Sequence, residues 1–154
     1  MYAYQLFEKI KNQALAAYRE SNNKIMYFAG CNLFSQMREE GFSKEESCQA
    51  VIGGFACVAC NDGKVSRDEF NAYVTMTGDN SLDYDTFFNI MSKYNKQQYR
   101  DNTVRLFNRI RNAETAHSFL SLCIGASIVD GRIAEAEETF CTSLCEVFLN
   151  RFDY

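Results

Sequence analysis

The sequence contains no proline, no tryptophan and one histidine, His117. Proline and glycine interrupt regular structure, so a chain of 154 residues with no proline and only 8 glycines favours a run of helices over a turn-rich β-sandwich. Hydrophobic residues make up 47% of the chain, which suffices for a packed core without metal or disulfide cross-links. The sequence therefore predicts an all-α protein with a single domain over residues 1–154.

The chain also lacks an apolar run of membrane-spanning length and a basic-then-apolar signal peptide, so we expect a cytoplasmic protein. Seven cysteines, an odd number in a reducing compartment, predict free thiols. Two pairs, Cys57 with Cys60 and Cys141 with Cys145, have a spacing that metal sites use. Because both pairs fall on apolar helical stripes, core thiols are the favoured interpretation and zinc is not expected.

Few residues are suited to nucleic-acid binding or catalysis. The formal charge of −4 argues against a dedicated nucleic-acid binder, and the best basic cluster (Arg105, Arg109 and Arg111) is interpreted as a solvated helix face. The chain lacks a glycine-rich phosphate loop and an evident nucleophile–histidine pair. We therefore expect no enzyme, and a hydrolase that uses Asp62 and Asp130 as paired carboxylates is a distant alternative.

Hydrophobic periodicity predicts about seven to eight helices. Residues 1–42 form a helical N-terminal extension with helices near Tyr4–Glu20 and Lys24–Glu40, and residues 43–148 form the core of the domain. Ser43 and Glu46 have the spacing of a capping box that opens a third helix. This third helix is apolar nearly all round, so we place it at the centre of the domain.

The segment after this helix is repeated later in the chain. Residues 62–70 read DGKVSRDEF and residues 130–138 read DGRIAEAEE. In each copy an apolar helix precedes Asp-Gly, and a glutamate follows seven positions after the aspartate: Glu69 after Asp62, and Glu137 after Asp130. Two hairpins that each have one apolar face would bury those faces together, which predicts a helical bundle with a pseudo-twofold internal repeat.

Each motif resembles the second half of an EF-hand loop, with the aspartate, glycine and final glutamate in place. The residues at the first and third loop positions are Val58 and Cys60 in one copy, and Ala126 and Ile128 in the other. These side chains offer no oxygen ligand to a hard cation, so neither loop alone is a competent EF-hand site.

Two interpretations of the carboxylates stay open. As helix-terminus residues, Ser66 and Glu69 would form a second capping box. As cation ligands, Asp62 and Asp130 would explain why negative charge follows helix C-termini, where the helix dipole disfavours it. The second copy has Ala134 at the capping position and still has Glu137, so capping is not a sufficient reason for that glutamate.

The two hairpins, together with Leu82-Asp83-Tyr84-Asp85 between them, resemble the tellurite-resistance TerB-like family over about Ser43 to Phe148. The resemblance implies a non-catalytic, cytoplasmic bacterial protein linked to tellurite resistance and stress response. It implies protein partners and peripheral association with the inner membrane. It also implies a divalent-cation site (Mg²⁺, Mn²⁺ or Ca²⁺) formed by acidic residues of both hairpins, here Asp62, Glu69, Asp130 and Glu137.

Our first hypothesis is therefore a metal-binding module in which the two Asp-Gly corners meet and together complete an oxygen shell. The alternative is a protein-interaction adaptor without a metal. In that alternative the acidic motifs are only helix caps, and an exposed apolar groove binds a partner.

Overall fold

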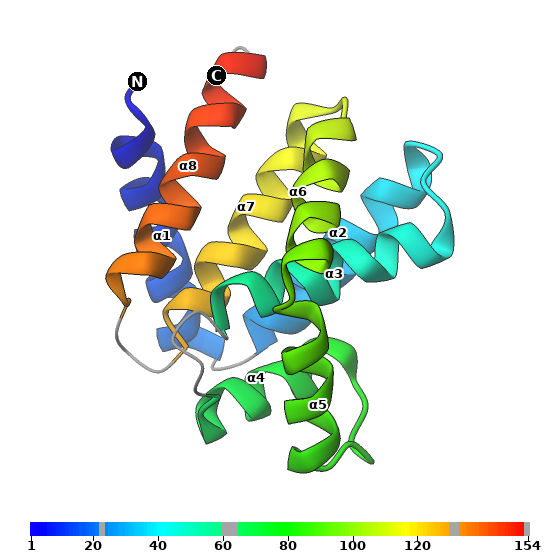
Figure 1. Cartoon of the computed structure of the whole chain (residues 1–154). Helices are drawn as coiled ribbons and strands as arrows, with labels where there is room; N and C mark the ends of the chain where they lie inside the picture. Colours follow the sequence, from blue (N-terminus) through cyan, green and yellow to red (C-terminus); the bar gives the residue numbers. More distant parts are fainter. Residues whose placement is uncertain (22–23, 60–64, 130–132, 153–154) are drawn as a thin grey trace.

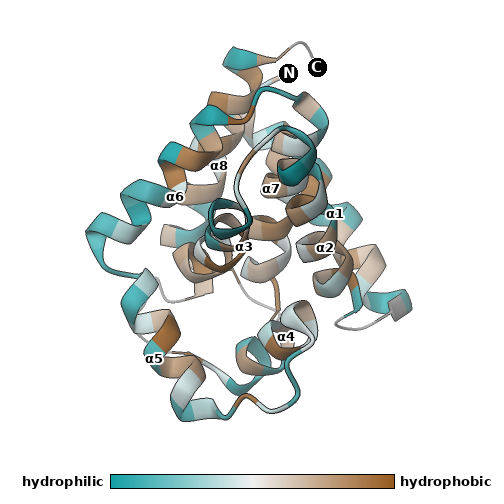
Figure 2. Cartoon of the chain, turned by 90° about the vertical axis from the view of Figure 1, so that its right-hand side faces the viewer, coloured by the Kyte–Doolittle hydropathy of each residue, from teal (hydrophilic) through white to brown (hydrophobic). Residues whose placement is uncertain are grey.

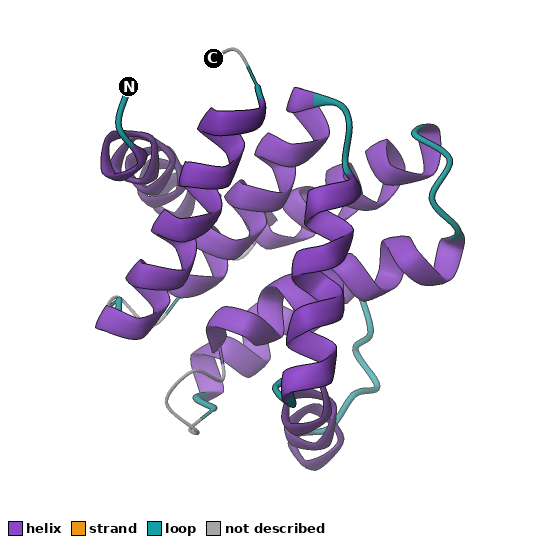
Figure 3. Cartoon of the chain, turned by 45° about the horizontal axis from the view of Figure 1, so that its top comes forward, coloured by secondary structure: helices purple, strands orange, loops and turns teal. Residues whose placement is uncertain are grey.

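The computed structural model describes residues 1–21, 24–59, 65–129 and 133–152, and these residues form eight α-helices and no strand (Figure 1, Figure 3). The prediction of an all-α fold is confirmed. In chain order the helices are α1 (Ala3–Ser21), α2 (Lys24–Glu39), α3 (Lys44–Ala59), α4 (Arg67–Thr77), α5 (Tyr84–Tyr94), α6 (Gln97–Arg109), α7 (Ala113–Ser127) and α8 (Glu135–Arg151). In the described part of the chain, none of these helices combines the length and the apolar composition that a membrane crossing requires.

Helices α3 and α7 form the centre of the protein. Ten of the 16 residues of α3 and ten of the 15 residues of α7 are buried, as expected for helices that are apolar nearly all round. The two helices pack directly against each other: a Cβ atom added to Gly54 would lie 3.2 Å from Leu122 Cδ2 and 3.4 Å from Cys123 Sγ. The predicted central position of the third helix is therefore confirmed.

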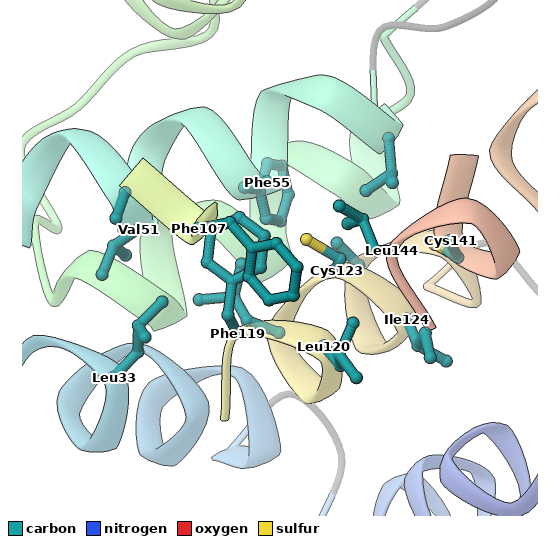
Figure 4. Close-up of a cluster of buried hydrophobic side chains, with 14 of the residues drawn as sticks. Leu33, Val51, Phe55, Phe107, Phe119, Leu120, Cys123, Ile124, Cys141 and Leu144 are labelled. Atoms are coloured by element: carbon teal, nitrogen blue, oxygen red, sulfur yellow. The ribbon is translucent and has the colours of Figure 1, made fainter. Parts of the chain in front are cut away.

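The core between these helices is built from aromatic and branched side chains (Figure 4). Phe107 of α6 and Phe119 of α7 are fully buried, and their ring centroids lie 4.9 Å apart. Phe55 of α3 packs edge-on against Tyr73 of α4. Helix α6 lies at the outside of the bundle and presents mostly hydrophilic residues along its length (Figure 2).

The N-terminal helices share this core. Helix α1 packs against α7 and α8, and α2 packs against α3, α4 and α7. Leu6 and Phe7 of α1, and Leu33 and Met37 of α2, are buried. Residues 1–42 are thus part of the same hydrophobic core as the segment that carries the two motifs.

The helices of the two hairpins have different neighbours. Helices α3 and α7, which precede the two Asp-Gly motifs, are in mutual contact, as the repeat predicts. Helix α4, which follows the first motif, packs against α2, whereas α8, which follows the second, packs against α7 and α1. The pseudo-twofold relation between the hairpins stays a prediction.

Candidate functional site

In the first hairpin, Glu69 is part of a complete capping box at the start of α4. The Ser66 hydroxyl oxygen accepts a hydrogen bond from the Glu69 backbone N–H at 3.1 Å, and Glu69 Oε1 accepts one from the Ser66 backbone N–H at 3.1 Å. Glu69 is 7% exposed. The helix-cap role predicted for this residue is confirmed, and Asp62 lies outside the described residues.

In the second hairpin, Glu137 is half-buried in the first turn of α8. The N-cap residue Ala134 has the extended backbone of a capping position, φ −69° and ψ 149°, but its methyl side chain forms no capping hydrogen bond. Asp130 lies outside the described residues. The structure therefore describes two of the four predicted ligands, and only Glu69 is in a complete box.

The described flanks of both hairpins meet at Arg100, on α6. Its Nη1 donates to the carbonyl oxygen of Cys57, in the last turn of α3, at 3.3 Å and to Asn95 Oδ1 at 2.8 Å. Its guanidinium also lies over the ring of Phe140 of α8, 5.6 Å from the centroid. One positive charge is thus placed between the end of α3 and the start of α8.

The acidic segment between the motifs is part of the scaffold. Asp83 Oδ1 accepts a hydrogen bond from the Thr86 backbone N–H at 2.7 Å, which caps α5 and lowers the pKa of Asp83. The Tyr84 hydroxyl donates to the carbonyl oxygen of Val65, just before α4. Asp85 is exposed in the first turn of α5. This segment therefore ties α5 to the start of α4.

No group of three or more His, Cys, Asp or Glu side chains within the described ranges is arranged to hold a metal ion. This finding covers Glu69 and Glu137, and it does not include Asp62 and Asp130. The metal hypothesis for the four carboxylates stays a prediction.

The cysteines fall into two groups. Cys57, Cys123, Cys141 and Cys145 are buried. Burial raises the pKa of Cys57 to about 11 and that of Cys145 to about 12, so both thiols are protonated at neutral pH. This burial agrees with the core interpretation, whereas Cys60 lies outside the described residues. Cys31 and Cys48 are exposed.

In the predicted basic cluster, Arg105 donates to Asn102 of its own helix, whereas the other two arginines contact other segments. Arg109 Nη1 lies 2.7 Å from Glu46 Oε2, on α3. Arg111 contacts Glu40 through its backbone N–H and its guanidinium. These contacts hold the end of α6 against the turn between α2 and α3. They agree with the interpretation of the arginines as a solvated helix face.

His117 is half-buried on α7, beside a hollow that Asn32 and Gln36 of α2 also line. Burial, followed by the nearby charge of Lys9, lowers the pKa of His117, so its imidazole is neutral at neutral pH. Its Nδ1 lies 3.5 Å from Ser121 Oγ, one turn along the same helix. This distance is at the long limit of a hydrogen bond.

An apolar hollow lies between α2, α3 and α4, and we call it the α2–α3–α4 groove. It has a volume of about 290 Å³. Its lining is mostly apolar, from Gly30, Cys31, Phe34, Ser35, Cys48, Val51, Ile52, Met76 and Thr77. A Cβ atom at Gly30 would lie 2.9 Å from Met76 Cγ, so this glycine permits the close approach of α4 to α2 that forms the floor.

Two aromatic residues of α2 are exposed one helical turn before Cys31, which lines the groove. Tyr27 and Phe28 of α2 are 46% and 58% exposed and lie one turn before Cys31. An exposed apolar groove is part of the adaptor alternative, in which neither residue is named. A signal for them exists: Met26, Gly30, Leu33 and Met37 form the buried stripe of α2, and Tyr27 and Phe28 fall outside it.

The two capping positions lead to a prediction. We expect Ala134→Ser to raise the free energy of unfolding by about 0.5–1 kcal/mol, because the new hydroxyl can cap α8 and Glu137 stands three residues later, as in a capping box. We expect Ser66→Ala to lower it by about 1 kcal/mol, because it removes an existing cap. Urea unfolding followed by circular dichroism measures both. Equal loss of stability in both variants would contradict this account of the two helix starts.

Comparison with known proteins adds no relative: no family model matches the chain, and neither a curated protein nor a solved structure does so.

Proposed function

We propose that this protein is a non-catalytic interaction module whose α2–α3–α4 groove binds an apolar segment of a partner protein. The groove itself carries the proposal, because a concave and mostly apolar surface can take up the apolar anchor side chains of a docked helix. Its volume of about 290 Å³ is at the lower end for ligand pockets, which suits one or two large apolar side chains of a docked helix.

Charge around the groove indicates the chemistry of the partner. None of the described lining residues is charged. Thr77, the last residue of α4, lines one end, where the helix dipole places partial negative charge. Asp79 is exposed two residues later, and the whole chain has a net charge of −4. A helix that is apolar on one face and basic on the other fits these features best.

The test uses a fluorescein-labelled amphipathic Leu/Lys peptide of about four helical turns. We expect its fluorescence anisotropy to rise with protein concentration, and a peptide of equal composition with the leucines dispersed to bind less. Ser35→Arg should weaken binding by about tenfold, because it brings positive charge and bulk into the groove from an exposed position.

Asn32→Arg is the matched control, because Asn32 is also exposed on α2 but lines the hollow beside His117. It adds the same charge one turn away, so its affinity should stay within about twofold of the wild-type value. Equal weakening by both variants would show that net charge, and not the groove, determines binding.

We propose a second candidate, the divalent-cation module of the TerB-like resemblance, with Asp62, Glu69, Asp130 and Glu137 as ligands. Arg100 contacts both Cys57 on α3 and Phe140 on α8, so the described flanks of the two hairpins lie near each other, as this candidate requires. The positive charge of Arg100, by contrast, opposes the binding of a cation beside it. This candidate includes the other properties that the resemblance implies: a cytoplasmic location, a role in tellurite or chemical stress, and peripheral membrane association. The complete capping box of Glu69 favours the adaptor instead.

The cation candidate predicts that millimolar Mg²⁺, Mn²⁺ or Ca²⁺ raises the melting temperature, because an ion that binds only the folded state stabilises it. The Asp62→Ala/Asp130→Ala variant should lose this shift. Asp85→Ala, at an exposed acidic residue of α5, is the control and should keep it. Differential scanning calorimetry measures the shift, and an unchanged wild-type melting temperature would exclude this candidate.

A further inference from the structure

The two exposed thiols lie on one surface. Among the six described cysteines, only Cys31 and Cys48 are exposed, and both line the α2–α3–α4 groove, one from α2 and the other from α3. The other four described cysteines are buried in the core. Thiol–disulfide exchange requires access to the sulfur and a thiolate, and burial raises the pKa of the core thiols. The fold therefore concentrates accessible thiols at the groove.

We propose that Cys31 and Cys48 are a modification site for low-molecular-weight disulfides of the glutathione type, and that the adduct closes the groove. The thiolate of either cysteine attacks one sulfur of the small disulfide. A protein–S–S–R bond forms, the original S–S bond breaks, and the second half leaves as the free thiolate. The cysteine's proton goes to solvent, and a free thiol reverses the step by the same exchange.

The size and polarity of the adduct explain its effect. A polar tripeptide attached inside a groove of about 290 Å³ occupies space that a partner's apolar side chains would need. Ile52 and Phe34, which offer apolar surface to the partner, would be covered. The modification of the two thiols can be tested by itself, whereas its effect on docking rests on the proposed interaction function.

The position of the thiols also makes them reporters of the groove. Cys31 is one helical turn from Tyr27 and next to Gly30, at the floor formed with Met76. Cys48 is three residues before Val51, which lines the same groove. A docked partner should therefore slow the modification of both thiols, as the adduct should slow docking.

The experiment starts from Cys60→Ser protein, which leaves the six described cysteines. Folded protein is incubated with excess glutathione disulfide and analysed by intact mass and peptide mapping. We expect adducts at Cys31 and Cys48, and adducts at Cys57, Cys123, Cys141 and Cys145 only after urea is added. Two results would contradict the proposed modification site. One is equal modification of buried and exposed thiols in the folded state, and the other is the absence of an adduct at the exposed pair.

The same sample is then titrated with the Leu/Lys peptide. We expect the adduct to weaken binding by at least about tenfold and dithiothreitol to restore it. A Cys31→Ser/Cys48→Ser variant should bind the peptide, and its affinity should not change after incubation with glutathione disulfide. Adduct formation with unchanged affinity overturns the closing of the groove. Adduct formation with no peptide binding by unmodified protein overturns the interaction function and leaves the modification site standing.

Discussion

Phe119→Ala is expected to lower the free energy of unfolding by about 3–5 kcal/mol, the range for removal of a fully buried aromatic side chain. Phe119 is fully buried on α7, and its ring centroid lies 4.9 Å from that of Phe107 (Figure 4). Its Cε2 atom would lie 3.6 Å from a Cβ atom added to Gly54. Alanine at this position leaves a cavity between three helices that cannot all move inward. Guanidinium unfolding followed by circular dichroism at the helix band measures the loss.

Phe88→Ala is the matched control for this prediction. Phe88 is 41% exposed on α5, so its removal creates no closed cavity and should change stability by about 0.5 kcal/mol or less. A loss at Phe88 as large as that at Phe119 would mean that α7 is not the central helix of the core.

The stability of the core and the binding surface are connected through α3. One side of this helix contacts α7 at Gly54, and another side contributes Val51 and Ile52 to the α2–α3–α4 groove. Loosening of the α3–α7 contact would therefore also displace the wall of the groove. A destabilised core variant should lose peptide affinity even when it is folded, which makes the exposed Ser35 a better position than a core residue for testing docking.

The local elements of this fold could be predicted from the sequence because their signals are local. The Ser66–Glu69 pair fixes the start of α4, and both hydrogen bonds of the capping box are present. Gly41 follows the second helix and has φ +99°, a conformation that glycine adopts without strain, so its residue type is itself a local signal for the helix end. Residues 48–59 are apolar nearly all round the helix, and this pattern predicted the central position of α3.

The groove could not be located in this way, because it depends on contacts between distant segments. The periodicity of α2 leaves Tyr27 and Phe28 outside its buried stripe, but only the packing of α2 against α3, α4 and α7 decides where a groove forms. The contact of Gly30 with Met76 joins two helices that are far apart in sequence. No periodicity within α2 or α4 contains that information.

The acidic hairpins are a second example of contacts that local sequence patterns do not predict. The spacing of Glu69 and Glu137 is identical, yet a serine at position 66 and an alanine at position 134 give the two glutamates different local surroundings. The bond from Arg100 to the Cys57 carbonyl spans 43 residues, and its position between the hairpin flanks has no local signal. Sequence alone therefore predicts the motifs and their caps, but not which charge lies between them.

Gly53→Ala should also reduce stability strongly, through overpacking at the crossing of α3 and α6. A Cβ atom at Gly53 would lie 2.1 Å from Thr103 Oγ1 and 3.2 Å from both Thr103 Cβ and Cγ2. Thr103 is fully buried, and its hydroxyl donates to the Tyr99 carbonyl oxygen, so this short branched side chain cannot easily turn away. We expect a net loss of about 1–3 kcal/mol in urea unfolding, even though alanine favours a helix by about 1 kcal/mol over glycine.

A double-mutant cycle separates the steric conflict from other effects of the change. Thr103→Ala removes Oγ1 and Cγ2, so Gly53→Ala should cost less in that background, with a coupling energy of about 1 kcal/mol or more. Gly54→Ala is the control within the same helix, because its closest contact, Leu122 Cδ2 at 3.2 Å, is the end of a flexible side chain. Its stability should stay within about 1 kcal/mol of wild type. Additive losses in the cycle would contradict the close contact between α3 and α6 at Gly53.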